Sequence, residues 1–202
     1  MGRRSDHTPE ELRALLVREG HALILERGFS RFSAREAARR AGYSVGTIYN
    51  VFGSLDGYLL AVNSHTFRLW SVWLERALDG VPHEGTARIE ALVRAYFSFA
   101  AEHANAWMSI YDHRIDRETE IAKEDVAARE GLTAIVDREV GQWMGTGADD
   151  AATRRLVRSL IATVHGHCSL WLSGSYALMN EDDPAGQALS RVLEVLAAQQ
   201  RS

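Results

Sequence analysis

Apolar residues recur along the chain at intervals of three or four positions, which is the spacing of an amphipathic α-helix. The first such stripe consists of Leu12, Leu16, Leu23 and Ile24. It follows Thr8-Pro9, a capping residue with a proline suited to a first helical turn, and it stops at Gly28. Because no two-residue alternation bounded by hairpin turns occurs, the pattern predicts an all-α fold.

Two short helices are predicted next, joined by a tight turn. Ser33 and Glu36 have the spacing of a capping box, in which the serine caps the helix and the glutamate reaches back. Gly42 ends this helix and Ser44 opens the next. Its apolar face consists of Val45, Ile48, Tyr49 and Phe52. This is a helix-turn-helix spacing, although any small three-helix bundle can share it.

The remainder of the chain is also predicted to be helical. Ser54 opens a long helix that ends at Gly80-Val81-Pro82. The later predicted elements are 86–103, a polar and partly helical stretch at 112–131, a helix through Leu132 and Trp143, and helices at about 149–177 and 184–200. We therefore expect a head at 1–53, a connecting helix at 54–80 and a second domain at 81–202.

Composition narrows the possible chemistry. The single cysteine, Cys168, allows neither an intramolecular disulfide nor a cysteine-based zinc site. His165 and His167 are two positions apart, so on a helix they point to different sides and make a poor metal pair. The chain contains no nucleophile elbow, phosphate loop or H-E-x-x-H motif. No catalytic residue, metal or cofactor is expected, and an enzyme on a helical scaffold is disfavoured.

Charge is distributed unevenly along the chain. The net charge is −4, yet arginine residues outnumber acidic residues within positions 1–60. A basic head on an acidic body indicates an anionic partner for the head. No apolar run has the length of a membrane span, and the N-terminus lacks the apolar core of a signal peptide. A cytoplasmic protein without a membrane partner is expected.

The run FSRFSAREAARRAGYSVGTIYNVFGSLDGYLLAV at 29–62 resembles the DNA-binding head of the TetR family of bacterial transcriptional regulators. The matching features are Gly28-Phe29, the capped helix from Ser33, Ala41-Gly42, and Ser44-x-Gly46-Thr47-x-Tyr49-x-x-Phe52. Farther along, Trp107 and His165-Gly166-His167 are similar to a subgroup with a Trp…His-Gly signature. The resemblance implies a helix-turn-helix head followed by a helical domain for effector binding and dimerisation.

The resemblance also implies which residues contact DNA. They are Ser33, Arg35, Ser44, Val45, Gly46, Thr47, Tyr49 and Asn50. Small residues such as Gly46 let the helix backbone approach the major groove, and hydroxyl groups can bind phosphates or base edges. Leu55 stands where the family commonly has a phosphate-binding lysine, which puts one backbone contact in doubt.

Several positions in the head keep a second interpretation. Tyr49 could instead be a half-buried core aromatic residue. Arg39 and Arg40 are interpreted as a solvated surface rather than as DNA contacts. Arg3 and Arg4 could form an arm that enters the minor groove, although arginine near a terminus is commonplace.

The second domain is expected to provide a dimer surface and an effector pocket. The apolar stripes of the last two helices should pack against those of a second copy, while other faces pack into the chain's own core. The candidate pocket residues are Trp70, Trp73, Phe97, Trp107, Met108, Tyr111, Trp143, His165 and Trp171. These aromatic residues could also form a core that binds no ligand.

The expected function is that of a homodimeric repressor, released from a palindromic double-stranded DNA operator by a small apolar or amphipathic effector. The alternatives are a constitutive DNA-binding regulator without an effector and, with the least support, a helical enzyme.

Overall fold

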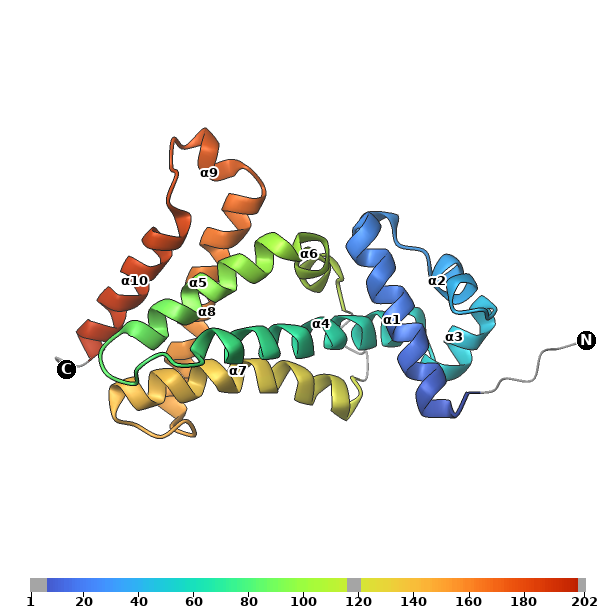
Figure 1. Cartoon of the computed structure of the whole chain (residues 1–202), viewed down its shortest axis with the longest axis horizontal. Helices are drawn as coiled ribbons and strands as arrows, with labels where there is room; N and C mark the ends of the chain where they lie inside the picture. The colour runs from blue at the N-terminus through green and yellow to red at the C-terminus, as the bar shows by residue number, and fades with distance from the viewer. Residues whose placement is uncertain (1–6, 116–120, 200–202) are drawn as a thin grey trace, which may run out of the picture. The chain divides into compact units, whose positions relative to one another are not determined.

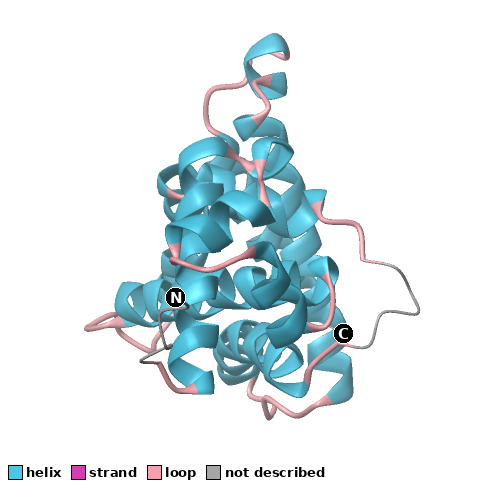
Figure 2. Ribbon diagram, turned by 90° about the vertical axis from the view of Figure 1, so that its right-hand side faces the viewer, coloured by secondary structure: helices cyan, strands magenta, loops and turns pink. Residues whose placement is uncertain are grey.

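The structure is a computed structural model that describes residues 7–115 and 121–199 (Figure 1). Within these residues the backbone forms helices and connecting loops without any strand (Figure 2), which confirms the all-α prediction. The α-helices are α1 (Pro9–Arg27), α2 (Ala34–Arg40), α3 (Val45–Phe52), α4 (Leu55–Leu78), α5 (Ala87–Glu102), α6 (Ala104–Asp112), α7 (Lys123–Met144), α8 (Ala151–Leu172), α9 (Ser175–Leu178) and α10 (Pro184–Gln199). A 3-10 turn, η1 (Phe29–Arg31), lies between α1 and α2.

The helices pack into two compact units that interleave along the chain. The head unit draws on Met1–Leu69 and His103–Arg129, and the body unit draws on Trp70–Glu102 and Glu130–Ser202. Helices α4 and α7 therefore each contribute residues to both units. The sequence predicted a head at 1–53, a connecting helix at 54–80 and a second domain at 81–202. That these segments are the domains of the protein stays a prediction.

Helix α1 begins and ends where its local signals predict. The Thr8 hydroxyl oxygen accepts a hydrogen bond from the Glu11 amide at 3.2 Å, and the Glu11 carboxylate accepts one from the Thr8 amide at 2.8 Å. This reciprocal pair satisfies two amide groups that the first helical turn otherwise leaves unbonded. Gly28 ends the helix with a φ of 74°, a conformation that favours glycine.

The core of the head unit is formed by α1, α2, α3, the first half of α4, and α6. Its buried residues are Leu16, Leu23, Ile24, Ala37, Ala38, Ile48, Tyr58, Leu59, Val62 and Ala106. The Tyr58 hydroxyl donates to the Leu16 carbonyl at 2.7 Å, which joins α4 to α1. A Cβ atom at Gly20 would overlap the Tyr58 ring and hydroxyl, so the close approach of these two helices requires glycine there.

Helix α6 was not predicted as a separate element. The Asn105 side-chain amide donates to the Leu25 carbonyl of α1 at 2.8 Å. The Ser109 hydroxyl donates to the Asn63 side-chain oxygen of α4 at 3.0 Å. These bonds attach α6 to two helices that are distant in sequence, and such tertiary pairing leaves no local pattern. The polar stretch at 112–131 is helical from Lys123, so α7 begins well before Leu132.

In the body unit, α8 and α10 lie side by side and α5 packs against both (Figure 1). Their buried apolar residues are Leu92, Val157, Leu160, Val164, Cys168, Ala188, Val192 and Leu196. The helix predicted at 149–177 is not continuous, because Gly174 adopts a left-handed conformation with a φ of 77° and separates α8 from α9. The amphipathic spacing continues through this break, so periodicity alone could not locate it.

Candidate functional site

Helix α3 buries one side and presents the other to solvent. Ile48 is fully buried, and the Phe52 ring lies 4.9 Å from the Tyr58 ring. On the opposite side Gly46 and Asn50 are exposed, and Tyr49 is 47% exposed. Tyr49 is therefore a surface residue rather than the half-buried core aromatic residue that was the alternative interpretation. The exposed side combines hydrogen-bonding groups with an uncovered stretch of helix backbone.

Gly46 is not required by packing within the chain. A Cβ atom at this position would meet only the Ser44 hydroxyl oxygen, at 3.5 Å, which is an ordinary contact. Glycine in a helix is about 1 kcal/mol less favourable than alanine. A larger side chain would therefore fit at this position, and no contact within the chain offsets the low helix propensity of glycine. Close approach of an external partner to the helix backbone is a physical reason for its presence.

The other residues at the start of α3 surround that glycine. Ser44 occupies the N-cap position, but its hydroxyl makes no capping bond to the backbone and lies 3.4 Å from the Thr47 hydroxyl. The capping interaction predicted for Ser44 is thus absent. Val45 and Thr47 are half-buried, and Ser44 is exposed. The exposed Ser44 hydroxyl can bind an oxygen of a ligand.

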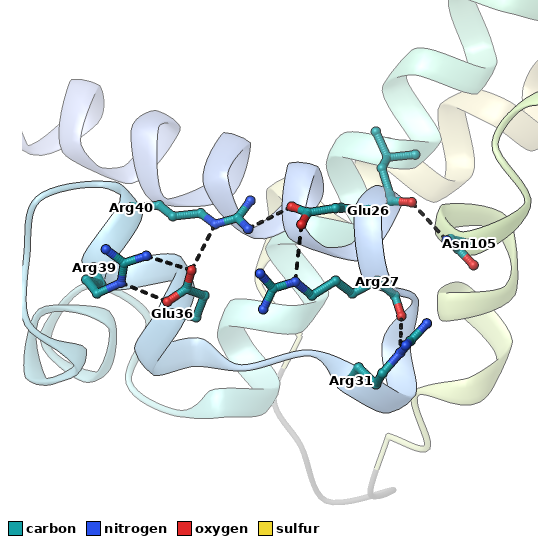
Figure 3. Close-up of polar contacts among 8 residues, drawn as sticks. Glu26, Arg27, Arg31, Glu36, Arg39, Arg40 and Asn105 are labelled. Carbon is teal, nitrogen blue, oxygen red and sulfur yellow. Dashed lines mark hydrogen bonds and ion pairs between the residues drawn. The ribbon is translucent and has the colours of Figure 1, made fainter.

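Helix α2 begins with the predicted cap but not with the full capping box. The Ser33 hydroxyl oxygen accepts a hydrogen bond from the Glu36 amide at 3.3 Å. The Glu36 carboxylate does not reach back, because both its oxygens bind Arg39 at 2.8 Å and one also binds Arg40 at 3.3 Å (Figure 3). Two charged partners compete more strongly for this carboxylate than a single amide does.

Arg40 is also paired with an acidic residue of α1. Its guanidinium lies 2.7 Å from the Glu26 carboxylate, which also binds Arg27 (Figure 3). Hydrogen bonds from Arg39 and Arg40 lower the pKa of Glu36 to about 2, so this carboxylate remains charged at neutral pH. Arg39 and Arg40 are therefore both paired with acidic side chains. The sequence predicted a solvated surface at these positions and did not indicate the ion pairs.

Arg35 differs from these two arginines. It is exposed on α2, and no acidic side chain pairs with it among the residues that the structure describes. Arg35 is thus a basic group of the helix-turn-helix available for an anion.

At the start of α4, the Ser54 hydroxyl oxygen accepts a hydrogen bond from the Gly57 amide at 2.9 Å, as predicted, and Leu55 is exposed beside it. Arg3 and Arg4 lie outside the described residues.

Two contacts of the helix-turn-helix were not anticipated from the sequence. His7 Nδ1 lies 3.0 Å from the Tyr43 hydroxyl, which links the start of α1 to the turn between α2 and α3. The Arg13 guanidinium lies over the Phe52 ring at 4.8 Å and binds the Glu124 carboxylate at 2.6 Å. The partners are far apart in sequence, so no local motif could have indicated these contacts.

The candidate effector residues fall into both packing units. Trp107, Met108 and Tyr111 belong to the head unit, where Trp107 is fully buried and lies 5.1 Å from the Tyr111 ring. The other candidates belong to the body unit. A single pocket formed by all nine residues stays a prediction.

The body-unit candidates other than Trp143 belong to an aromatic cluster that also includes Tyr96 and Phe99. Trp70 stacks on Phe99 with ring centroids 4.9 Å apart and contacts Tyr96 edge-on at 4.8 Å. The Tyr96 hydroxyl lies 3.1 Å from His165 Nδ1, and burial lowers the pKa of His165. Trp73 Nε1 donates a hydrogen bond to the Ser98 hydroxyl at 3.1 Å, and the Phe97 ring lies 5.7 Å from the Trp171 ring. Trp143 is half-buried on α7. A hydrogen-bonded Tyr96–His165 pair therefore lies within a mostly apolar cluster.

Two hollows open on the body unit. One, of about 360 Å³, is lined by residues of α4 and α7, including Val72, Glu75 and Ile135. The other, of about 490 Å³, is lined by Trp171, Ala177, Asn180, Glu181 and Asp182. Trp171 is the one predicted pocket residue that lines either of these hollows, and through its contact with Phe97 it joins the second hollow to the aromatic cluster.

The stripes predicted for the dimer surface divide between core and solvent. Leu160, Val164 and Leu196 are buried. Leu170 and Trp171 of the stripes are exposed, and so is Val195 of α10, which lies outside the predicted stripes. The described part of the chain contains no group of three or more His, Cys, Asp or Glu side chains placed to hold a metal ion. It also contains no helix with the length and apolar character that crossing a membrane requires.

Two family models match the chain over most of its length. The model described as bacterial regulatory proteins of the tetR family matches residues 16–62. The model described as a tetracyclin repressor-like C-terminal domain matches residues 89–196. The first match contains the helix-turn-helix, and the second contains most of the body unit.

Relatives and solved structures agree with these matches. The HTH-type transcriptional activator FasR from Mycolicibacterium smegmatis is 27% identical over 173 residues, which cover 85% of this chain and 77% of FasR. Thermus thermophilus FadR, a TetR-family transcriptional repressor in complex with lauroyl-CoA, has a TM-score of 0.65 and 20% identity, with 92% and 93% of the two chains covered. A protein with unknown function from Rhodococcus sp. RHA1 has a TM-score of 0.70 and 22% identity, with 97% of each chain covered. At these identities the two structures establish similarity of fold.

Proposed function

Because this chain belongs to the TetR family of bacterial regulatory proteins and is a DNA-binding transcriptional regulator rather than an enzyme, we propose that it is a homodimeric repressor. In this proposal it binds a palindromic operator and is released by a small apolar or amphipathic effector. The observation that carries the proposal is the exposed side of α3, where Gly46 uncovers helix backbone beside Tyr49 and Asn50. A helix presented in this way suits insertion into the major groove.

The groups around that surface suit particular parts of the duplex. Hydroxyl groups of Ser44, Thr47 and Tyr49 can donate to phosphate oxygens, and the Asn50 amide can bind a phosphate or a base edge. Ser33 at the start of α2 and Arg35, which has no acidic partner among the described residues, can make further phosphate contacts. Val45 can select bases by apolar contact with a thymine methyl group. Specificity thus comes from the first turns of α3, while affinity comes from the surrounding contacts.

Dimerisation supplies the second half-site. One helix-turn-helix reads few base pairs, and two copies related by a two-fold axis place their recognition helices about 34–36 Å apart on a palindrome. The exposed apolar residues Leu170, Trp171 and Val195 of α8 and α10 support these helices as the contact between copies.

The proposed effector binds the body unit. The aromatic cluster around Trp70 and the Tyr96–His165 pair combine apolar surface with few polar groups, as small-molecule sites do. The FadR structure, in complex with lauroyl-CoA, makes a medium-chain acyl-CoA the first effector to test. An effector can release DNA only if it binds the non-operator state more tightly than the operator state.

The experiment measures binding of the purified protein to labelled duplexes from the DNA flanking its own gene. We expect one dimer per palindrome, an affinity that falls steeply with salt, and release by lauroyl-CoA at micromolar concentration. Failure to bind any of these duplexes at low salt contradicts the proposed operator. Binding without release by acyl-CoAs of several chain lengths contradicts this effector class.

A constitutive regulator is the second candidate, and tight aromatic packing favours it. Trp70 is 2% exposed and its ring lies within 3° of parallel to that of Phe99, an arrangement complete without a ligand. This candidate predicts operator binding that no small molecule alters. Transcription in vitro from the same promoter separates repression from the activation named for FasR, because an activator raises transcript yield.

A further inference from the structure

Helix α9 exposes an apolar pair at the end of the body unit. Leu178 is 87% exposed and Met179 is 58% exposed, and we call this pair the α9 knob. Singly exposed apolar residues are normal on protein surfaces, but adjacent ones indicate a contact with another molecule. In Figure 1 α9 forms the tip where α8 and α10 are joined.

The knob is held in place by its own turn. Gly174 and Asn180, on either side of α9, both have a positive φ, at 77° and 56°. Between them Tyr176 is buried, with its ring 6.0 Å from that of His167 on α8. The Glu181 amide donates to the Tyr176 carbonyl at 3.1 Å and closes the turn. The backbone therefore fixes α9 so that Tyr176 points inward while Leu178 and Met179 point outward.

A hollow of about 490 Å³ opens directly beside the knob. Its lining is Trp171, Ala177, Asn180, Glu181 and Asp182. The knob lies between Ala177 and Asn180 in sequence, and neither of its two residues belongs to this lining. The volume is within the range that holds a small ligand, so the hollow can accept a leucine and a methionine side chain.

We propose that the α9 knob of one copy docks in the hollow beside Trp171 of a second copy, and that the second copy docks its own knob in return. A two-fold axis requires a self-complementary surface, and a knob adjacent to a hollow meets that requirement. The exposed Leu170 of α8 extends the apolar surface, and Glu181 and Asp182 provide a polar rim. This inference rests on the proposed homodimer and adds to it a contact between α9 and the end of α8, where Leu170 and Trp171 belong to the proposed dimer stripe.

A second copy suits the hollow better than an unrelated protein or the effector. The same short segment carries both the projecting group and its receptor, and a homodimer alone uses both at once.

The first test substitutes Leu178→Asp and measures the dimer dissociation constant by sedimentation velocity. We expect an increase of at least about 100-fold, because one substitution removes the contact from both copies. The matched control is Val72→Asp, an apolar residue of α4 that is 50% exposed, and it should leave dimerisation unchanged. Because Leu178 is exposed, circular dichroism of the variant should match that of the wild type.

The second test detects the contact directly. A Leu178→Cys chain and an Ala177→Cys chain are mixed, allowed to exchange, and treated with a short bismaleimide. The native Cys168 should not interfere, since it is fully buried and burial raises its thiol pKa to about 12. Cross-linked dimers should form in the mixture, at several times the yield of the Ala177→Cys chain alone.

The outcomes separate this inference from the proposed dimer. If Val195→Asp on α10 splits the dimer while Leu178→Asp has no effect, the knob contact is wrong and the dimer stands. An equal yield of cross-links in mixed and single preparations also overturns the knob contact. A wild-type protein that stays monomeric at micromolar concentration, with and without operator DNA, overturns both.

Discussion

Helix α3 and helix α9 each expose residues that the chain itself does not explain, but the two sets differ in chemistry. The exposed side of α3 has an uncovered helix backbone at Gly46, a phenol at Tyr49 and an amide at Asn50. The end of α9 presents the apolar Leu178 and, directly after the helix, Met179. Among the described residues, the side chains of neither set form a hydrogen bond within their own unit.

The difference indicates two kinds of partner. Hydrogen-bonding groups around a bare backbone suit a polar and negatively charged surface such as a DNA groove. An apolar pair suits a surface from which water is excluded on contact. The chemistry of the exposed groups on each helix therefore indicates the kind of partner that covers them.

Gly46→Leu gives the largest expected effect on the α3 surface. Operator affinity should fall by roughly 100-fold or more, because a bulky side chain separates the helix from contacts worth about 1–3 kcal/mol each. The fold should gain up to about 1 kcal/mol, since leucine favours a helix. Fluorescence anisotropy with operator DNA and urea unfolding measure the two effects.

The matched control is Gly131→Leu, a helical glycine of α7 at which an added Cβ meets no atom within 4 Å. It should raise stability similarly and leave operator affinity unchanged. If Gly46→Leu bound the operator as tightly as this control, close approach of α3 to DNA would be excluded.

Acid should weaken the head unit through His21. Burial, with smaller contributions from His65 and His103, lowers the pKa of His21 to about 4 from an ordinary value of 6.5. As pH falls below 6.5 the unfolded chain gains this proton before the folded chain does. The resulting stability is complete above pH 6.5 and declines by about 3 kcal/mol as the pH approaches 4.

Urea unfolding between pH 7.5 and 4.5 measures this decline. Arg18 and Arg68 face the neighbouring His65, so the same profile is recorded at two salt concentrations. In a His21→Phe variant, the loss of stability over this pH range should shrink by at least half. An unchanged profile in that variant would remove His21 as the cause.

Arg35→Ala should weaken operator binding by about tenfold and reduce the slope of log affinity against log salt by about one. The Arg39→Ala variant is the natural comparison, because Glu36 already neutralises Arg39. It should lose less than about threefold in affinity. Equal losses for both variants would show that the ion pairs of α2 do not decide which arginine binds phosphate.

Tyr49→Phe should give the smallest effect, a loss of about three- to tenfold in operator affinity with unchanged stability. The substitution removes only the phenol hydroxyl from an exposed side chain. An unaltered affinity would mean that Tyr49 contributes its ring and not a hydrogen bond.

Local signals predicted the first three helices closely because their ends depend on neighbouring residues. Thr8, Gly28 and Ser33 act through bonds or backbone angles within a few positions. The same reasoning failed for Ser44 and for the carboxylate of Glu36, where another side chain competed for the capping group. Such competition depends on side-chain placement in space, which a motif does not encode.

The sequence alone was sufficient for the all-α fold, the helix-turn-helix and the family, because helical spacing and capping residues act over short range. Tertiary structure decided that Arg40 meets Glu26 of α1, that α6 joins the head unit, and that α9 exposes Leu178 in a turn closed by the Glu181 amide. It also separated Gly20, which packing requires, from Gly46, which packing does not. Both are helical glycines in sequence, and only the presence or absence of a facing side chain distinguishes them.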